Sequence, residues 1–107
     1  MSAPFEALAG LNRLVHEPAR LAILTALSAG ESADFLFLQS LTGLSKGNLS
    51  SHLSKLADAG LVDVAKEFAG NVPQTRLSLT REGRKQIDDY WRRIDALRKD
   101  AKRWPRR

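Results

Sequence analysis

The sequence predicts a single, mainly α-helical domain with one small β-hairpin and a long C-terminal helix. Apolar residues recur at helical spacing through most of the chain. After position 60 apolar and polar residues alternate instead, and helical spacing resumes at position 81. A chain of 107 residues cannot build two substantial cores, so we assign residues 1–107 to one domain.

The first part of the chain is expected to form three helices. Apolar spacing predicts an N-terminal helix over residues 5–15. Pro18 permits a second helix over residues 19–29, because proline is tolerated in a first helical turn. Ser32 is the expected N-cap of a short amphipathic helix over residues 33–41.

The second part is expected to form a helix, a hairpin and a final helix. Ser45 caps the helix over residues 45–59, which buries a stripe of leucines. Alternating residues on both sides of a turn-rich segment predict a hairpin over residues 61–79. Thr80 caps the last helix, residues 81–104. The buried stripe comprises Leu49, Leu53 and Leu56.

The charge is unevenly distributed along the chain. The formal net charge is +5, but residues 1–80 carry a net charge of −1 and residues 81–107 a net charge of +6. Cysteine is absent and only His16 and His52 are histidines, so thiolate sites are excluded and a metal site is not expected. No phosphate-binding loop or catalytic triad pattern stands out. We expect neither an enzyme nor a bound cofactor.

The sequence also bears on location. The N-terminal residues lack a basic segment followed by an apolar one, and no apolar run approaches the roughly 18 residues that a membrane helix needs. We therefore expect an unprocessed cytoplasmic protein that does not bind membranes.

The order of elements indicates nucleic-acid binding. A tight turn at residues 42–44 separates two short helices, and such a turn projects the second helix outward, where a DNA major groove can admit it. The face of helix 45–59 opposite the leucines carries small polar side chains, which allow close approach to a groove and supply hydrogen bonds.

Two stretches of the chain resemble the winged-helix regulators of the MarR and ArsR type: LSKGNLSSHLSKLADAGLVDVAKEF and, after it, RLSLTREGR. The resemblance covers about residues 19–85 and implies a winged helix-turn-helix domain. It implies that residues 45–59 form the recognition helix and that residues 66–76 form a wing that follows phosphates, although this wing is less basic than in many relatives. The expected DNA-binding residues are Ser45, Lys46, Asn48, Ser50, Ser51, His52, Lys55, Lys66, Asn71 and Arg76.

The last helix predicts a dimer. Its apolar residues recur at spacings of three and four, as in a coiled-coil seam, over about 36 Å at 1.5 Å per residue. We expect it to pair with the same helix of a second subunit, joined by the N-terminal helix. A solvated helix folded back on its own domain is the alternative. The expected dimerisation residues are Phe5, Leu8, Leu11, Ile87, Tyr90, Trp91, Ile94, Leu97 and Trp104.

These observations together predict a homodimeric transcriptional regulator that binds double-stranded DNA at specific sequences. The resemblance also implies a small-molecule effector, of unknown identity, near Tyr90 or Trp91. Because the first eighty residues are nearly neutral, a winged-helix module that binds another protein without specific DNA binding stays as the alternative.

Overall fold

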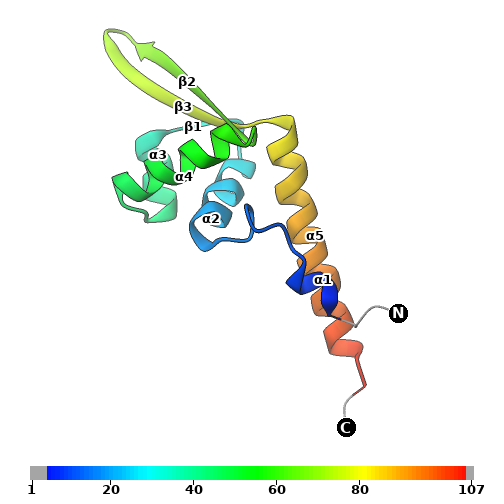
Figure 1. Ribbon diagram of the computed structural model, residues 1–107. Helices are drawn as coiled ribbons and strands as arrows, with labels where there is room; N and C mark the ends of the chain where they lie inside the picture. Colours follow the sequence, from blue (N-terminus) through cyan, green and yellow to red (C-terminus); the bar gives the residue numbers. More distant parts are fainter. Residues whose placement is uncertain (1–4, 106–107) are drawn as a thin grey trace.

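The computed structural model describes residues 5–105, and these form a helical body from which a hairpin projects (Figure 1). The β2–β3 hairpin leaves one end of the body and α5 runs out past the other end, so the molecule extends over 65 × 23 × 22 Å. Within residues 5–105, no helix is both long and apolar enough to cross a bilayer. The elements are α1 (Glu6–Ala9), α2 (Pro18–Ser28), β1 (Ala33–Asp34), α3 (Phe35–Thr42), α4 (Lys46–Asp58), β2 (Val62–Ala69), β3 (Val72–Leu79) and α5 (Arg81–Arg103).

The long helices begin where capping side chains satisfy free backbone N–H groups. The Ser45 hydroxyl accepts from the Asn48 amide at 3.2 Å, and the Thr80 hydroxyl accepts from the Gly83 amide at 2.9 Å. Both caps confirm the sequence-based prediction. At α2 the Glu17 carboxylate accepts from the Arg20 amide at 2.8 Å, with Pro18 in the first turn as expected.

The cap of α3 was predicted wrongly. Ser32 does not cap this helix; the Asp34 carboxylate does, accepting from the Phe37 amide at 2.7 Å. The helix starts late because Ala33 and Asp34 form strand β1, which pairs with Leu77 and Arg76 of β3. A two-residue strand has no periodicity, so only its pairing partner reveals it.

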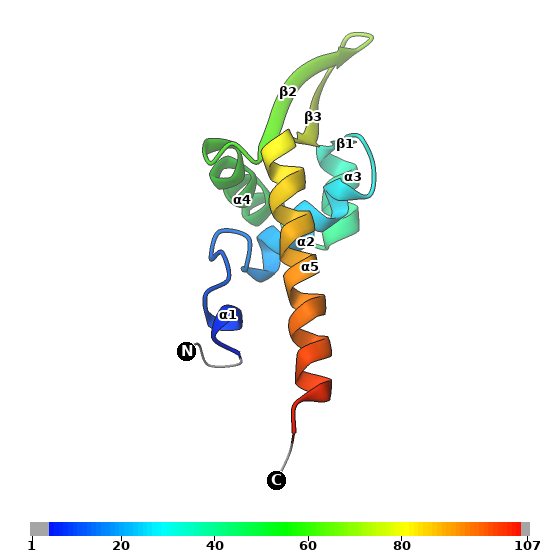
Figure 2. The ribbon, with the colours of Figure 1, turned by 90° about the vertical axis from the view of Figure 1, so that its right-hand side faces the viewer.

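The sheet is antiparallel, in the order β1-β3-β2. The predicted hairpin is confirmed, with strands that pair from Val62 and Leu79 at its base to Ala69 and Val72 at its tip. Gly70 adopts a φ of 65° in the turn, a conformation that glycine tolerates best. Only the base of the hairpin contacts the core, so its distal half projects into solvent (Figure 2).

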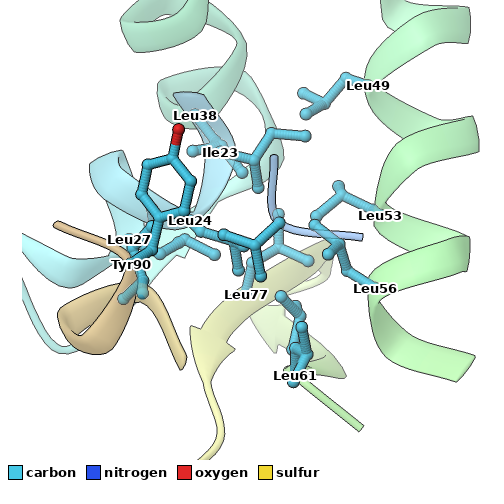
Figure 3. Packing of buried hydrophobic residues seen from close by; sticks show 14 of the residues in the cluster. Ile23, Leu24, Leu27, Leu38, Leu49, Leu53, Leu56, Leu61, Leu77 and Tyr90 are labelled. Atoms are coloured by element: carbon cyan, nitrogen blue, oxygen red, sulfur yellow. The ribbon is translucent and has the colours of Figure 1, made fainter. Parts of the chain in front are cut away.

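One hydrophobic core joins α2, α3, α4, the hairpin base and α5. Leu49, Leu53 and Leu56 of α4 point into it together, which confirms the predicted stripe (Figure 3). They pack with Ile23 and Leu24 of α2, both fully buried. Burial of a side chain of this size contributes about 1.5–3 kcal/mol. The core therefore orients α4 with its polar face outward.

The N-terminal helix is much shorter than predicted. Residues 5–15 were expected to be helical, but α1 contains only four residues and the chain then turns. The Asn12 side chain accepts from the Leu14 amide at 2.9 Å and donates to Gln86 of α5 at 2.9 Å. These contacts compete with continued helix, and they place Leu11 and Val15 in the core.

The seam predicted on α5 is divided between two environments. Ile87 and Tyr90 are 0% and 6% exposed, and with Leu11 at 5% they belong to the core of their own subunit. Association with a second subunit could bury little further surface of these three residues. Trp91 and Trp104 are exposed, and the second half of α5 extends beyond the body, where α1 lies beside it (Figure 2).

Candidate nucleic-acid interface

The polar face of α4 is uncovered. We define the open face of α4 by five exposed residues, and most of the expected contact residues lie on it or at its edge. Ser45 is exposed at the start of the helix, where its hydroxyl also serves as the cap. Lys46 and Ser50 are exposed on the side of α4 that faces the wing. The open face comprises Gly47, Asn48, Ser51, Ser54 and Lys55.

His52 differs from the other expected contact residues. Its side chain is only partly exposed, and its Nδ1 atom lies 3.3 Å from the Arg20 guanidinium and 3.8 Å from the Glu17 carboxylate. Arg20 also donates from Nε to the Leu14 carbonyl at 2.7 Å. His52 thus joins α4 to the start of α2.

Glu17 is held as a carboxylate in this cluster. Burial alone raises the pKa of its carboxyl group, but the backbone N–H groups of Arg20 and Ala19, with the charges of His52 and Arg20, lower the pKa below the usual 4.5. Sequence reasoning missed Glu17 and Arg20 as site residues. The only local signal was that Glu17 precedes Pro18 at a helix start, which predicts a cap but no contact with residue 52.

The wing presents one face to α4. Successive side chains of a strand point to opposite faces, so the register places Lys66 with its partner Thr75, and Phe68 with its partner Pro73, on the same face. Lys66 and Thr75 line a groove of about 480 Å³ whose other wall includes Ser50 and Ser54 of α4. Lys66 therefore lies in the groove between the wing and α4.

Arg76 lies on the other face of the wing. Its Nε atom is 3.6 Å from the Glu67 carboxylate, and its NH1 group donates to the Ser32 hydroxyl at 2.7 Å. Arg76 is thus turned away from the groove and its charge is partly balanced by Glu67. Asn71 is exposed at the tip, beside Gly70.

Within the described residues, the surplus of positive charge lies on α5 and is remote from the open face of α4. Part of the charge of α5 is balanced, since Arg92 pairs with Asp89 at 2.9 Å and Arg103 with Asp100 at 3.3 Å. Figure 1 shows this part of α5 at the end of the molecule opposite the hairpin. Net charge by itself would therefore have pointed to α5 and not to α4.

Comparison with known proteins agrees with this geometry. The sequence model of the winged helix DNA-binding domain family matches residues 19–98. The chain belongs to this family. The match includes α2 to α4, the wing and most of α5, and the winged helix-turn-helix fold inferred from the sequence is confirmed.

Similar proteins come from several organisms. The winged-helix chain is 30% identical over 88 residues to an uncharacterized protein of Methanocaldococcus jannaschii, covering 82% of this chain and 96% of that protein. A transcriptional regulator homologue from Pyrococcus horikoshii superposes with a TM-score of 0.79 at 26% identity, covering 88% and 92% of the two chains. A MarR family regulator from Silicibacter pomeroyi shares the fold with a TM-score of 0.65 at 24% identity, covering 89% of this chain and 61% of that regulator. The winged-helix part of the resemblance is thereby confirmed, and the MarR family regulator shares this fold.

Proposed function

We propose that this winged-helix protein is a homodimeric transcriptional regulator that binds specific sequences in double-stranded DNA. The observation that carries the proposal is the open face of α4, which no described part of the chain covers and which lies beside a projecting wing. Its side chains are small or basic, so the helix backbone can approach base edges closely.

Cations at the ends of this surface suit phosphate contacts. Lys46 and Lys55 lie at opposite ends of α4 and both are exposed. Each Lys or Arg that neutralises a phosphate releases a counterion, so binding weakens as salt rises. Base contacts then come from Ser51 and its neighbours on the open face, which distinguish one sequence from another.

The exposed apolar residues of α5 and α1 support the dimer. Trp104 is half exposed and packs edge-on against Phe5, with 5.8 Å between ring centroids. Leu8 is also exposed, and Trp91 is exposed farther along α5, beside Thr25 of α2. Two subunits joined through these residues would present two α4 helices, so the DNA site is expected to be a pseudopalindrome with half-sites about 10 base pairs apart, or roughly 34 Å.

The DNA proposal is tested by selecting bound fragments from genomic DNA and measuring affinity by mobility shift over a salt series. Lys46→Ala and Lys55→Ala are each expected to reduce the salt slope by about one unit. Ser51→Ala is expected to change sequence preference instead. Lys99→Ala, which removes an exposed cation from α5, is the matched control. Unchanged salt slopes and preference in all three α4 variants would exclude α4 as the DNA-binding element.

The dimer is tested separately by sedimentation over a range of protein concentrations. Trp104→Ala is expected to weaken association roughly ten- to thirtyfold, since exposed tryptophans often dominate interface energies. Leu36→Ala, an exposed apolar change on α3, serves as the control. A wild-type protein that stays monomeric at all concentrations would contradict the dimer and favour a solvated α5.

A second candidate function is binding to another protein. It is favoured by an apolar surface on α3, where Leu36 is 76% exposed and Phe37 and Leu41 are more than half exposed. A selection that recovers no preferred DNA sequence, together with a tight protein partner lost in Leu36→Ser, would support this candidate over the first.

A small-molecule effector also stays a proposal. Tyr90 lines a cavity of about 120 Å³ between α5 and the segment that contains Leu11, Asn12 and Val15. This cavity lies between the N-terminal segment and the helix expected to form the dimer. A ligand bound there would shift these two segments and thereby change the spacing of the two α4 helices. Loss of DNA binding on addition of a ligand, absent in a variant with Val15→Phe, would test it.

A further inference from the structure

The structure connects His52 of α4 to a charged group that the family resemblance does not include. The Nδ1 atom of His52 lies 3.3 Å from NH1 of Arg20. Arg20 is held in place: its Nε donates to the Leu14 carbonyl at 2.7 Å, its NH2 donates to the Arg13 carbonyl at 3.4 Å, and the Glu17 carboxylate lies 3.9 Å from its NH1. Its side chain is 13% exposed.

This contact indicates which ring nitrogen of a neutral His52 carries the proton. A guanidinium group only donates hydrogen bonds, and a neutral imidazole has one donor nitrogen and one acceptor nitrogen. In the neutral ring, the Nδ1 atom therefore accepts from Arg20, and the proton lies on Nε2; the Glu17 carboxylate is farther from Nδ1, at 3.8 Å, beyond hydrogen-bond distance. The hydrogen bond made by one ring nitrogen sets the role of the other.

The Nε2 atom is left for a ligand. The structure gives it no hydrogen bond among residues 5–105, yet no buried side-chain nitrogen or oxygen in that range lacks a partner. Nε2 therefore reaches solvent. His52 is 20% exposed at the margin of α4 nearest α2, next in sequence to Ser51 of the open face.

We propose that Arg20, supported by Glu17, is a positioning residue that fixes His52 as an Nε2–H donor toward a base edge in the major groove. The proposal rests on the DNA-binding function proposed above. A fixed donor pairs with an acceptor, and guanine offers two, N7 and O6, whereas cytosine offers only the N4 amino donor at that edge. Because adenine N7 and thymine O4 are acceptors too, His52 would discriminate against cytosine on the strand that it contacts.

The tautomer is tested first, without DNA. Two-bond proton–nitrogen NMR correlations on the free wild-type protein distinguish protonated from unprotonated ring nitrogens, and His16→Gln assigns the signals of the two histidines. We expect an unprotonated Nδ1 and a protonated Nε2 at His52. Arg20→Met, which keeps the apolar stem and removes the donors, is expected to give a mixture of tautomers, and Arg20→Lys to restore the single one. A proton on Nδ1 in the wild type would overturn the positioning role.

The consequence for recognition is tested on the selected DNA site by substituting each base pair in turn. Wild type and Arg20→Lys are expected to discriminate about tenfold or more at the position that His52 contacts, within the usual cost of a mismatched pair. Arg20→Met, and also His52→Gln, whose amide both donates and accepts, should lose discrimination at that position alone. Equal weakening at every position would assign Arg20 a purely structural role and overturn the proposal.

The two experiments separate the inference from the function on which it rests. A wild-type protein with the expected tautomer but no sequence preference would overturn the DNA-binding function, and the reading role of His52 with it. A sequence-specific protein with the proton on Nδ1 would overturn only the role of Arg20. Thermal unfolding of each variant verifies that Arg20→Met is folded.

Discussion

Gly83, in the first turn of α5, packs directly against the backbone of Leu61 at the entry to the wing. A Cβ atom at position 83 would overlap the Leu61 carbonyl oxygen. That oxygen also accepts a hydrogen bond from the Thr80 amide at 3.0 Å, so it cannot move aside freely. This contact joins the base of the hairpin to the long helix, and it requires a residue without a side chain.

Replacing Gly83 with alanine is therefore expected to destabilise the fold. Alanine is normally the better helix former, but here the methyl group meets backbone rather than a flexible side chain. We expect the free energy of unfolding to fall by about 1–3 kcal/mol, the usual cost of overpacking. Urea unfolding measures it. A Gly83→Ala protein as stable as the wild type would show that α5 can shift on the hairpin base.

Gly47 gives the opposite expectation and serves as the matched control. It lies in α4 with open space where a Cβ would be, so Gly47→Ala should stabilise the protein by about 0.5–1 kcal/mol. The added methyl group lies on the open face, and DNA affinity should fall several-fold in mobility shifts. If stability rises and affinity is unchanged, the α4 backbone does not approach DNA closely at this position.

The two cations of the wing are expected to behave differently. Lys66 lines the groove beside α4, whereas Arg76 is turned to the other face and is bound to Glu67 and Ser32. Lys66→Ala should reduce the salt slope of DNA binding by about one unit, and Arg76→Ala should leave the slope nearly unchanged. Mobility shifts at several salt concentrations compare them. A reduced salt slope for Arg76→Ala and an unchanged slope for Lys66→Ala would instead place DNA on the face of the wing that carries Arg76.

Glu17 predicts a pH dependence of stability. Its pKa in the folded protein is lower than the usual 4.5, so the unfolded chain binds a proton more readily than the folded one. The stabilisation from the Glu17 carboxylate is thus present above pH 4.5 and is lost as the pH falls through the folded-state pKa. Because the carboxylate is partly exposed, we expect an effect of up to about 1 kcal/mol. Urea unfolding from neutral to acidic pH measures it.

Glu17→Gln is the corresponding test variant. The glutamine oxygen can still accept from the Arg20 amide, so the cap is retained while the charge is removed. Its stability should decline less than that of the wild type as the pH is lowered below 4.5. Parallel pH profiles for the two proteins would mean that Glu17 has the same pKa in the folded and unfolded chains.

Features that depend on neighbours in the chain were predictable. The caps at Ser45 and Thr80 act on amides three residues away, and the leucine stripe of α4 follows from the helical repeat. The same local patterns indicated the hairpin and the polar face of α4. The helix predicted over residues 5–15 failed because Asn12 bonds to Gln86 instead of continuing a helix, a partner that no local pattern reveals.

Local patterning thus established the order of the elements and the side of α4 that is polar, because both depend on side-chain repeats and caps within a few residues. Packing between distant segments decided the rest. Arg20 and His52 are 32 residues apart in the chain, and Arg76 and Ser32 are 44 apart, so the contacts that orient His52 and turn Arg76 from the groove exist only in the folded chain. The burial of Ile87 and Tyr90 was decided in the same way. An apolar stripe on a helix can pack against its own subunit or against a second one, and the folded chain covers these two residues with its own core.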